Sequence, residues 1–373
     1  MIYLDNAATT KPKKEVIEVI TQALEEDWVN PSSKYKPSYD VKYKIDEARK
    51  IIADSINAEP NEIYFTSGGS EASCMALKSL INPYNHTWIA TSEVEHKSIL
   101  AHQNADERYE IPVKPDGMLD INDLKTWLET RHIYGNEYDN VLVSVQYANN
   151  ETGVIQNVKN ISKLVHQYGY IFHTDAVQAY PHGKIDVKAF GIDMMSVSGH
   201  KFGAPKGIGF LYIKESVSQL IENSLIYGSQ ERGLRGGTEN TPYILGLAKA
   251  VQLKSNADLI DKRRYFESEL EKIGCKINCK DSIRLDSIIS CMLPKGIVGE
   301  TMMYYLSFND IYVSTGSACN SSSERPSWVL EAIGLTEDEI RRTIRISISE
   351  ETTIEDIDTT IKTMVHIMKE KLR

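Results

Sequence analysis

Residues 141–147 read Val-Leu-Val-Ser-Val-Gln-Tyr, and this nearly continuous apolar run decides the fold class. A strand of a parallel sheet is covered by helices on both faces, so it is apolar on both sides instead of alternating. Residues 170–174 read as a neighbouring strand, and two more are expected near 194–198 and 209–213. Outward from this centre, strand-like and helix-like segments alternate through the first two thirds of the chain. That pattern predicts an α/β fold with a mostly parallel sheet of about seven strands, flanked by helices.

The last third of the sequence has a different character. After Pro242 a long helical stretch is followed by a strand at 288–293, a helix at 300–306 and a strand at 311–314. Residues 343–349, Thr-Ile-Arg-Ile-Ser-Ile-Ser, alternate strictly, which predicts a strand with its isoleucines on one face. A capping box of Thr352 and Glu355 is expected to begin the last helix. We therefore expect a smaller α+β domain here.

The length of the chain supports two domains. A chain of 373 residues is longer than one hydrophobic core usually fills. We assign residues 15–257 to a large domain, and residues 1–14 together with 258–373 to a small one.

Composition excludes several classes of function. The formal net charge of -10 argues against a nucleic acid as the main partner, and clusters such as Lys262-Arg263-Arg264 are typical of solvated helix faces. No apolar run is long enough to span a bilayer and no leader is recognisable, so a cytoplasmic protein is expected. Its 5 cysteines are an odd number, which favours reduced thiols over a disulfide framework, and no metal site is predicted.

Three polar clusters follow predicted strands, at the edge where open α/β sheets bind their ligands. The loop Thr66-Ser67-Gly68-Gly69-Ser70-Glu71 joins a strand to a helix, and its glycines and free helix N–H groups suit a phosphate. A tight turn capped by Ser70 is the alternative. The other clusters are Asn149-Asn150-Glu151 and Asp175 with Gln178. Asp175 either caps a helix or holds a cofactor's ring nitrogen protonated.

Two residues are candidates for covalent chemistry. Lys201 lies in an apolar-then-small segment, Ser196 to Gly203, where lost solvation lowers the pKa of an amine and favours a Schiff base. Spacing alone does not distinguish it from an exposed lysine. Cys319 lies in a small, polar stretch, Ser314 to Glu324, where a thiol is accessible and able to move toward a substrate. It is the best nucleophile candidate of the five cysteines. The alternative is an incidental exposed thiol.

Two further side chains suit ligand binding. Arg345, on the strand at 343–349, faces away from the isoleucines and could grip a carboxylate at two points or form an ordinary salt bridge. His96 begins a helix after a strand and could stack on a flat ring or transfer a proton.

Together these segments resemble the cysteine desulfurases, the NifS/IscS-like branch of the class V aminotransferases. The match runs nearly end to end, and the joint order of its short motifs makes it specific. The motifs are Tyr3-Leu4-Asp5-Asn6-Ala7-Ala8-Thr9-Thr10, Asn30-Pro31-Ser32-Ser33, the Thr66 to Glu71 loop, Glu95-His96-Lys97, Asn149-Asn150-Glu151-Thr152-Gly153, Asp175-Ala176-Val177-Gln178, Ser198-Gly199-His200-Lys201, Arg232-Gly233-Leu234-Arg235-Gly236-Gly237-Thr238 and Gly316-Ser317-Ala318-Cys319.

The resemblance implies a fold-type I enzyme with pyridoxal 5'-phosphate as cofactor. Lys201 would carry the cofactor, Asp175 would pair with its ring nitrogen, and His96 would stack on the ring and assist proton transfer. Gln178 and Asn150 would lie near the phenolic oxygen. The phosphate would be held by Gly69, Ser70, Ser198 and His200, with Thr238 of the partner subunit of a homodimer. The substrate carboxylate would be held by Arg345, Asn150 and Asn30.

The implied activity is conversion of L-cysteine to L-alanine, with a persulfide forming on Cys319. The sulfur would then pass to an acceptor protein for iron-sulfur clusters, thio-cofactors or tRNA thiolation. A selenocysteine lyase, a cysteine-sulfinate desulfinase and a class V transaminase are alternatives on the same scaffold, although a transaminase needs no loop thiol. A non-catalytic relative would have no chemical need for Lys201, Asp175, His96 and Cys319 together. Tyr35, where many relatives have histidine, and residues 226–229 depart from the family pattern.

Overall fold

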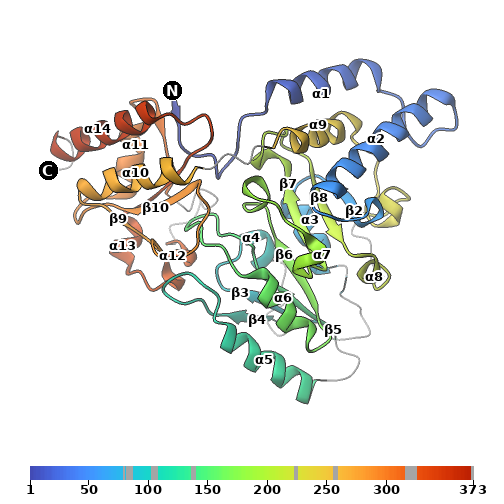
Figure 1. Cartoon of the computed structure of the whole chain (residues 1–373), viewed down its shortest axis with the longest axis horizontal. Helices are drawn as coiled ribbons and strands as arrows, with labels where there is room; N and C mark the ends of the chain where they lie inside the picture. Colours follow the sequence, from blue (N-terminus) through green and yellow to red (C-terminus); the bar gives the residue numbers. More distant parts are fainter. Residues whose placement is uncertain are drawn as a thin grey trace.

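The computed structural model describes residues 1–78, 80, 87–101, 108–135, 140–221, 226–254, 259–315 and 326–370. The elements form two lobes (Figure 1). We call the part around the seven-stranded sheet the large lobe, and the part that contains β1 and the elements from α10 to α14 the small lobe. None of the helices in the described ranges is both long and apolar enough to cross a membrane.

The seven-stranded sheet has the strand order β2-β8-β7-β6-β5-β3-β4. Only β8 runs antiparallel to its neighbours in this sheet, and the other pairs are parallel. This confirms the predicted α/β class with a mostly parallel sheet. The strands are β2 (Ile63–Thr66), β3 (Thr87–Ser92), β4 (Arg108–Ile111), β5 (Asn140–Ser144), β6 (Ile171–Asp175), β7 (Met194–Ser198) and β8 (Gly209–Ile213).

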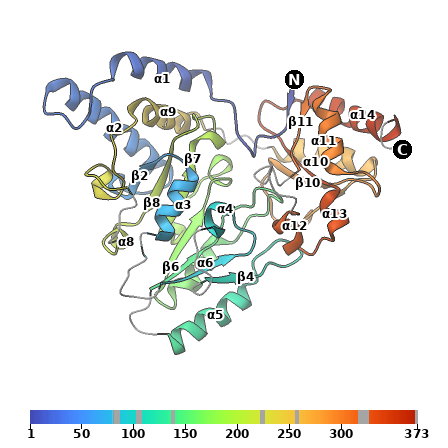
Figure 2. The same ribbon diagram turned by 180° about the vertical axis from the view of Figure 1, so that it is seen from behind.

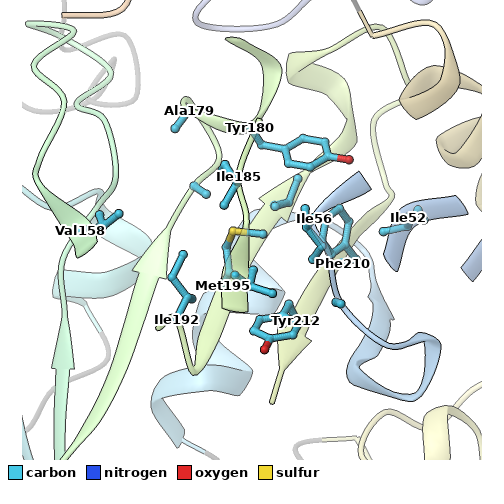
Figure 3. Packing of buried hydrophobic residues seen from close by; sticks show 14 of the residues in the cluster. Ile52, Ile56, Val158, Ala179, Tyr180, Ile185, Ile192, Met195, Phe210 and Tyr212 are labelled. Carbon is cyan, nitrogen blue, oxygen red and sulfur yellow. The ribbon is translucent and has the colours of Figure 1, made fainter. Parts of the chain in front are cut away.

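Strand β5 is buried on both faces, as its apolar run predicted. Val141 and Val143 belong to the largest hydrophobic cluster, whereas Leu142 points into a separate cluster formed with α3 on the opposite face. The first cluster contains Ile52 of α2, Ile56 directly after that helix and Phe210 of β8, and Figure 3 shows Ile56 next to Phe210. The helices of this lobe are α1 (Lys14–Glu26), α2 (Lys36–Ser55), α3 (Gly69–Lys78), α4 (Lys97–Leu100), α5 (Ile121–Tyr134), α6 (Val158–His166), α7 (Val187–Phe190), α8 (Glu215–Ser218) and α9 (Thr241–Gln252).

The small lobe is built on an antiparallel three-stranded sheet of order β12-β10-β9 and a parallel pair, β1 and β11. Leu4 at the chain start and Ile346 and Ile357 near its end share one hydrophobic cluster. The first residues therefore complete the core of the last third. The elements are β1 (Ile2–Tyr3), α10 (Ile260–Lys272), β9 (Lys276–Ile277), β10 (Ile288–Met292), α11 (Gly299–Ser307), β11 (Ile311–Tyr312), α12 (Trp328–Ala332), α13 (Glu337–Arg341), β12 (Thr343–Ser347) and α14 (Ile354–Glu370).

Two local predictions were wrong. The reciprocal cap before α14 joins Thr353 to Asp356, one residue later than the predicted pair Thr352 and Glu355, and Thr352 Oγ1 accepts the Ser349 N–H instead. Arg263 does not lie on a solvated face: it is 8% exposed, with Glu267 and Asp286 within ion-pair distance. One face of α10 is thus covered by the small-lobe core. The boundary at 257/258 falls where residues are not described, so the domain division stays a prediction.

Candidate active site

Asp175 ends β6 and is 7% exposed. The Val177 N–H donates to its Oδ1 at 2.9 Å. Burial raises the pKa of Asp175, and the opposing influences are His96, this backbone hydrogen bond and Lys201. A buried carboxylate of this kind is stabilised by a nearby positive charge, such as a protonated ring nitrogen.

Lys201 ends the short 3-10 turn Gly199–Lys201 that follows β7. Its Nζ donates to the carbonyl oxygens of Ala7 at 2.7 Å and Ala8 at 2.9 Å. Gln178 Nε2 also donates to the Ala7 oxygen, at 3.0 Å. The N-terminal segment therefore closes one side of the site and links Lys201 with Gln178.

The turn between β2 and α3 is pressed against the loops after β6 and β7. A Cβ added at Gly69 would lie 2.7 Å from Val177 Cγ2 and 3.3 Å from Ser198 Cβ, so a larger residue would displace this turn. Glycines at the N-terminus of a helix, here the ten-residue α3, let the backbone N–H groups come close to an anion. Such an arrangement is suited to holding a phosphate. Ser70 is exposed at this turn, and Glu71 accepts from Ser67 N and Arg235 Nε.

His200 lies in the turn that follows β7, between Ser198 and Lys201. Its Nδ1 is 3.2 Å from Thr9 Oγ1. Burial, together with Lys201 and Lys206, lowers the pKa of His200 to about 4, so its ring is neutral at neutral pH. A neutral imidazole can still donate one hydrogen bond to an anion.

His96 caps α4, and its Nδ1 accepts the Ser98 N–H at 3.1 Å. In the neutral ring this places the proton on Nε2. The preceding Glu95 is completely buried, and its Oε1 accepts from Ser92 Oγ and Gln146 N. Burial raises the pKa of Glu95 to about 8, and the charge of Asp175 adds to this effect. Sequence reasoning did not single out Glu95, although it stands directly before His96.

Arg345 on β12 connects the two lobes. Its side chain is 5% exposed, Nη1 donates to the Asn150 oxygen at 2.8 Å, and Nη2 donates to Asp5 Oδ1 at 2.7 Å. Its buried Nε has no hydrogen-bond partner among the described residues. A guanidinium fixed by two contacts with a donor unsatisfied is suited to an incoming carboxylate. Sequence reasoning missed Asp5 as its partner.

A cavity of about 390 Å³ lies between the lobes. Asn6, Ala7, Gln178 and Lys201 line it on the side of the site, but Asp175 and Arg345 do not. The cavity therefore borders the predicted cofactor position and does not coincide with it.

Of the remaining predicted site residues, two are exposed in the single chain and one lies outside the described residues. Asn30 is exposed in the turn between α1 and α2, at the end of these helices away from the small lobe (Figures 1 and 2). Thr238 is exposed as well. Cys319 lies outside the described residues.

Comparisons with known proteins identify the family of this chain. The family model "Aminotransferase class-V" matches residues 2–360. The cysteine desulfurase IscS of Methanosarcina thermophila is 39% identical over 387 aligned positions, which cover 100% of this chain and 93% of that protein. A solved structure named NifS-like protein has a TM-score of 0.87 at 30% identity, covering 99% of both chains. The structure of SspA in complex with cysteine has a TM-score of 0.80 at 32% identity, covering 93% of this chain and 99% of that one.

Enzymes of this family use pyridoxal phosphate, and the residues present fit that group. A buried carboxylate lies at the end of β6, a lysine follows β7, and a glycine turn at the N-terminus of α3 lies against Ser198. These features match the ring nitrogen, the aldehyde and the phosphate of the cofactor in turn. The chain therefore belongs to the class-V aminotransferases and, within them, to the cysteine desulfurases that depend on pyridoxal phosphate.

Proposed function

We propose that this enzyme converts L-cysteine to L-alanine and receives the released sulfur as a persulfide on Cys319. The observation that carries the proposal is that Lys201 and Arg345 both bond to one N-terminal segment, residues 5–8, and that the charge of Lys201 acts on buried Asp175. This arrangement offers a ring-nitrogen partner, an amine and a carboxylate grip to one amino acid. The relative SspA, solved in complex with cysteine, supports cysteine as the substrate.

Each residue has a distinct role in the proposal. Bound pyridoxal phosphate supplies an electron sink for negative charge that develops on the substrate carbon. Asp175 would hold the ring nitrogen of the cofactor protonated, and Lys201 would hold the cofactor and, as a free amine, would move the α-proton of the substrate. His96 would lie against the ring, with the proton of its neutral imidazole on Nε2. Arg345 and Asn150 fix the substrate carboxylate, which orients the Cα–H bond for removal.

The sulfur transfer balances without an external oxidant or reductant. Sγ of the Cys319 thiolate bonds to the substrate sulfur, and the substrate Cβ–S bond breaks with its electron pair left on Cβ. Cβ takes up the proton that the thiol gave up and becomes the methyl group of alanine. The sum is cysteine plus thiol giving alanine plus persulfide.

We also propose a homodimer. Large apolar side chains are exposed on α1, on α2 and near residue 227, which is typical of a covered interface. They are Ile17 (50%), Leu24 (61%), Trp28 (76%), Tyr39 (59%), Tyr43 (66%) and Tyr227 (92%). Asn30 lies between these helices, so in a dimer Asn30 and Thr238 would serve the site of the other subunit. The acceptor of the sulfur and the cytoplasmic location stay predictions.

Substitution of the two covalent residues tests the proposal. Cys319→Ser should abolish sulfide release from L-cysteine with a reductant present, and the visible absorbance of bound pyridoxal phosphate should persist. Lys201→Ala should lose the absorbance of the lysine-bound cofactor. Undiminished sulfide release by Cys319→Ser would refute the proposed role of this thiol.

A further inference from the structure

Helix α12 begins at Trp328, three positions after the end of the segment 316–325 that includes Cys319, and its cap and first residue are attached to the large lobe. Ser327 caps the helix, since its Oγ accepts the Leu330 N–H at 3.2 Å. The same Oγ donates to Glu151 Oε2 at 2.6 Å. Ser327 and Glu151 are each 3% exposed, so this contact is shielded from water. A hydrogen bond in such surroundings is electrostatically stronger than one exposed to water.

Trp328 makes a second attachment. Its Nε1 donates to the Glu95 backbone oxygen at 3.2 Å, and Lys97 Nζ lies 5.6 Å from its ring centre. Apolar contacts add to these two attachments between α12 and the large lobe. Figure 2 shows α12 on the side of the small lobe that faces α4. The residues of this cluster are Val94, Val113, Val329, Leu330 and Ile333.

The part of the large lobe that receives α12 is held rigidly. Gln146 Nε2 and Asn149 Nδ2 both donate to the Val94 oxygen, at 2.6 and 3.2 Å. Asn149 Oδ1 accepts the N–H groups of Glu151 and Thr152, each at 2.8 Å. Buried hydrogen-bond networks of this kind fix one conformation. The two loops so fixed are the ones that carry His96 and Asn150.

The chain is also fixed ahead of residues 316–325. Ser314 and Arg345 share two backbone hydrogen bonds. The Ser314 N–H donates to the Arg345 oxygen at 3.0 Å, and the Arg345 N–H donates to the Ser314 oxygen at 2.6 Å. The sequence on one side of the Cys319 segment is therefore attached to the residue proposed to bind the substrate carboxylate. The sequence on the other side is attached to the loops that carry His96 and Asn150.

We infer that Ser327 and Trp328 are positioning residues for the sulfur-transfer step, acting through their contacts with Glu151 and the Glu95 oxygen. The inference rests on the proposed function, because it takes Cys319 as the sulfur-accepting thiol. The two residues lie outside the set proposed to bind substrate and cofactor. They fix where the chain that carries Cys319 rejoins the site, and a misplacement of about 1 Å is enough to slow a reaction about 100-fold.

The inference predicts that one step slows while another does not. Removal of the α-proton needs Lys201 and the cofactor but no thiol, whereas persulfide formation needs Cys319 in place. The test uses two cofactor-loaded variants, Ser327→Ala and Trp328→Phe. The second keeps an aromatic side chain but removes the indole N–H donor. One readout is single-turnover persulfide on Cys319, followed by mass spectrometry with sulfur-labelled L-cysteine. The other is exchange of the α-proton of L-alanine in heavy water, followed by NMR.

Persulfide formation should slow about 10-fold to 100-fold in both variants, while alanine exchange stays within about 2-fold of wild type. Ser327→Thr keeps the hydroxyl and should restore most of the rate. Thr336→Ala is the matched control. Thr336 caps α13, which is the next helix and also has 5 residues, and it does so through an exposed capping box with Glu339. It should change neither readout.

The inference is overturned if both variants form the persulfide at the wild-type rate, or if exchange and persulfide formation fall together. Either result leaves the proposed function intact as long as the wild-type enzyme forms a persulfide on Cys319. A wild-type enzyme without that persulfide would overturn the proposed function, and the inference with it.

Discussion

Arg345→Lys should weaken the binding of L-cysteine through its carboxylate. The guanidinium uses Nη1 for the Asn150 oxygen and Nη2 for Asp5, and its buried Nε remains for a ligand. A lysine keeps the charge but has a single nitrogen. It cannot hold Asn150, Asp5 and a carboxylate in the same geometry.

The expected size follows from the burial of this side chain. A hydrogen bond to a charged group contributes about 1.5–3 kcal/mol, and 1.4 kcal/mol corresponds to a factor of ten. Loss of one such bond should therefore raise KM for L-cysteine about 10-fold to 150-fold. The Arg345 side chain is only 5% exposed, so solvent screening should reduce this little.

The assay compares L-cysteine with its methyl ester, whose carboxylate charge is masked. Wild type should prefer the free acid, and Arg345→Lys should lose most of that preference in KM for sulfide release. Bound cofactor absorbance and thermal unfolding serve as controls for an intact site. An equal loss for acid and ester, or an unchanged KM for the acid, would refute carboxylate recognition by Arg345.

Three further predictions concern buried charges. Asp175→Asn should still bind pyridoxal phosphate but should lower alanine α-proton exchange, measured by NMR, by a factor of about 100 or more, because the ring nitrogen loses its anionic partner. Burial raises the pKa of Glu95 to about 8, so between about pH 5 and pH 8 the folded state keeps a proton that the unfolded chain releases. This group should therefore lower the free energy of unfolding of the wild type as the pH rises through that window. Urea denaturation should show the free energy of unfolding of Glu95→Gln gaining on that of the wild type across the window, with a constant difference above about pH 8. A difference that does not change with pH would contradict this. Arg49→Ala should lower unfolding stability by about 3–5 kcal/mol, since it leaves buried Glu231 without its two-point partner, whereas Lys44→Ala, at a half-exposed pair with Asp27, should cost at most about 1 kcal/mol.

The class of fold could be predicted because its signals are local. The run 141–147 is apolar except at Ser144 and Gln146, and the structure places Val143 and Leu142 in clusters on opposite faces of the sheet. The cap before α14 was missed by one residue, because Thr352 and Thr353 each have an acidic residue three positions later. Only the backbone path decides which pair forms.

The contacts that complete the site could not be predicted from sequence. Asp5 and Arg345 are 340 positions apart, and Glu151 and Ser327 are 176 apart. Neither pairing follows from periodicity, because both depend on how the lobes pack. The roles of Asn30, Thr238 and Cys319 stay predictions for a different reason. The first two are exposed in the single chain, and the third lies outside the described residues.

The pairing of the first residues with the last third of the chain also bears on biosynthesis. β1 pairs with β11, and the Asn6 N–H bonds to the Ser347 oxygen, so we expect the segment that closes over Lys201 to be synthesised first but to take its place last. While the ribosome is still adding residues before 311, Ala7 and Ala8 lack the strands that hold their segment in place. Long-range contacts of this kind form late, after the local elements of each lobe. The nascent chain can thus complete its sheet around Lys201 and still remain open to the cofactor until translation ends.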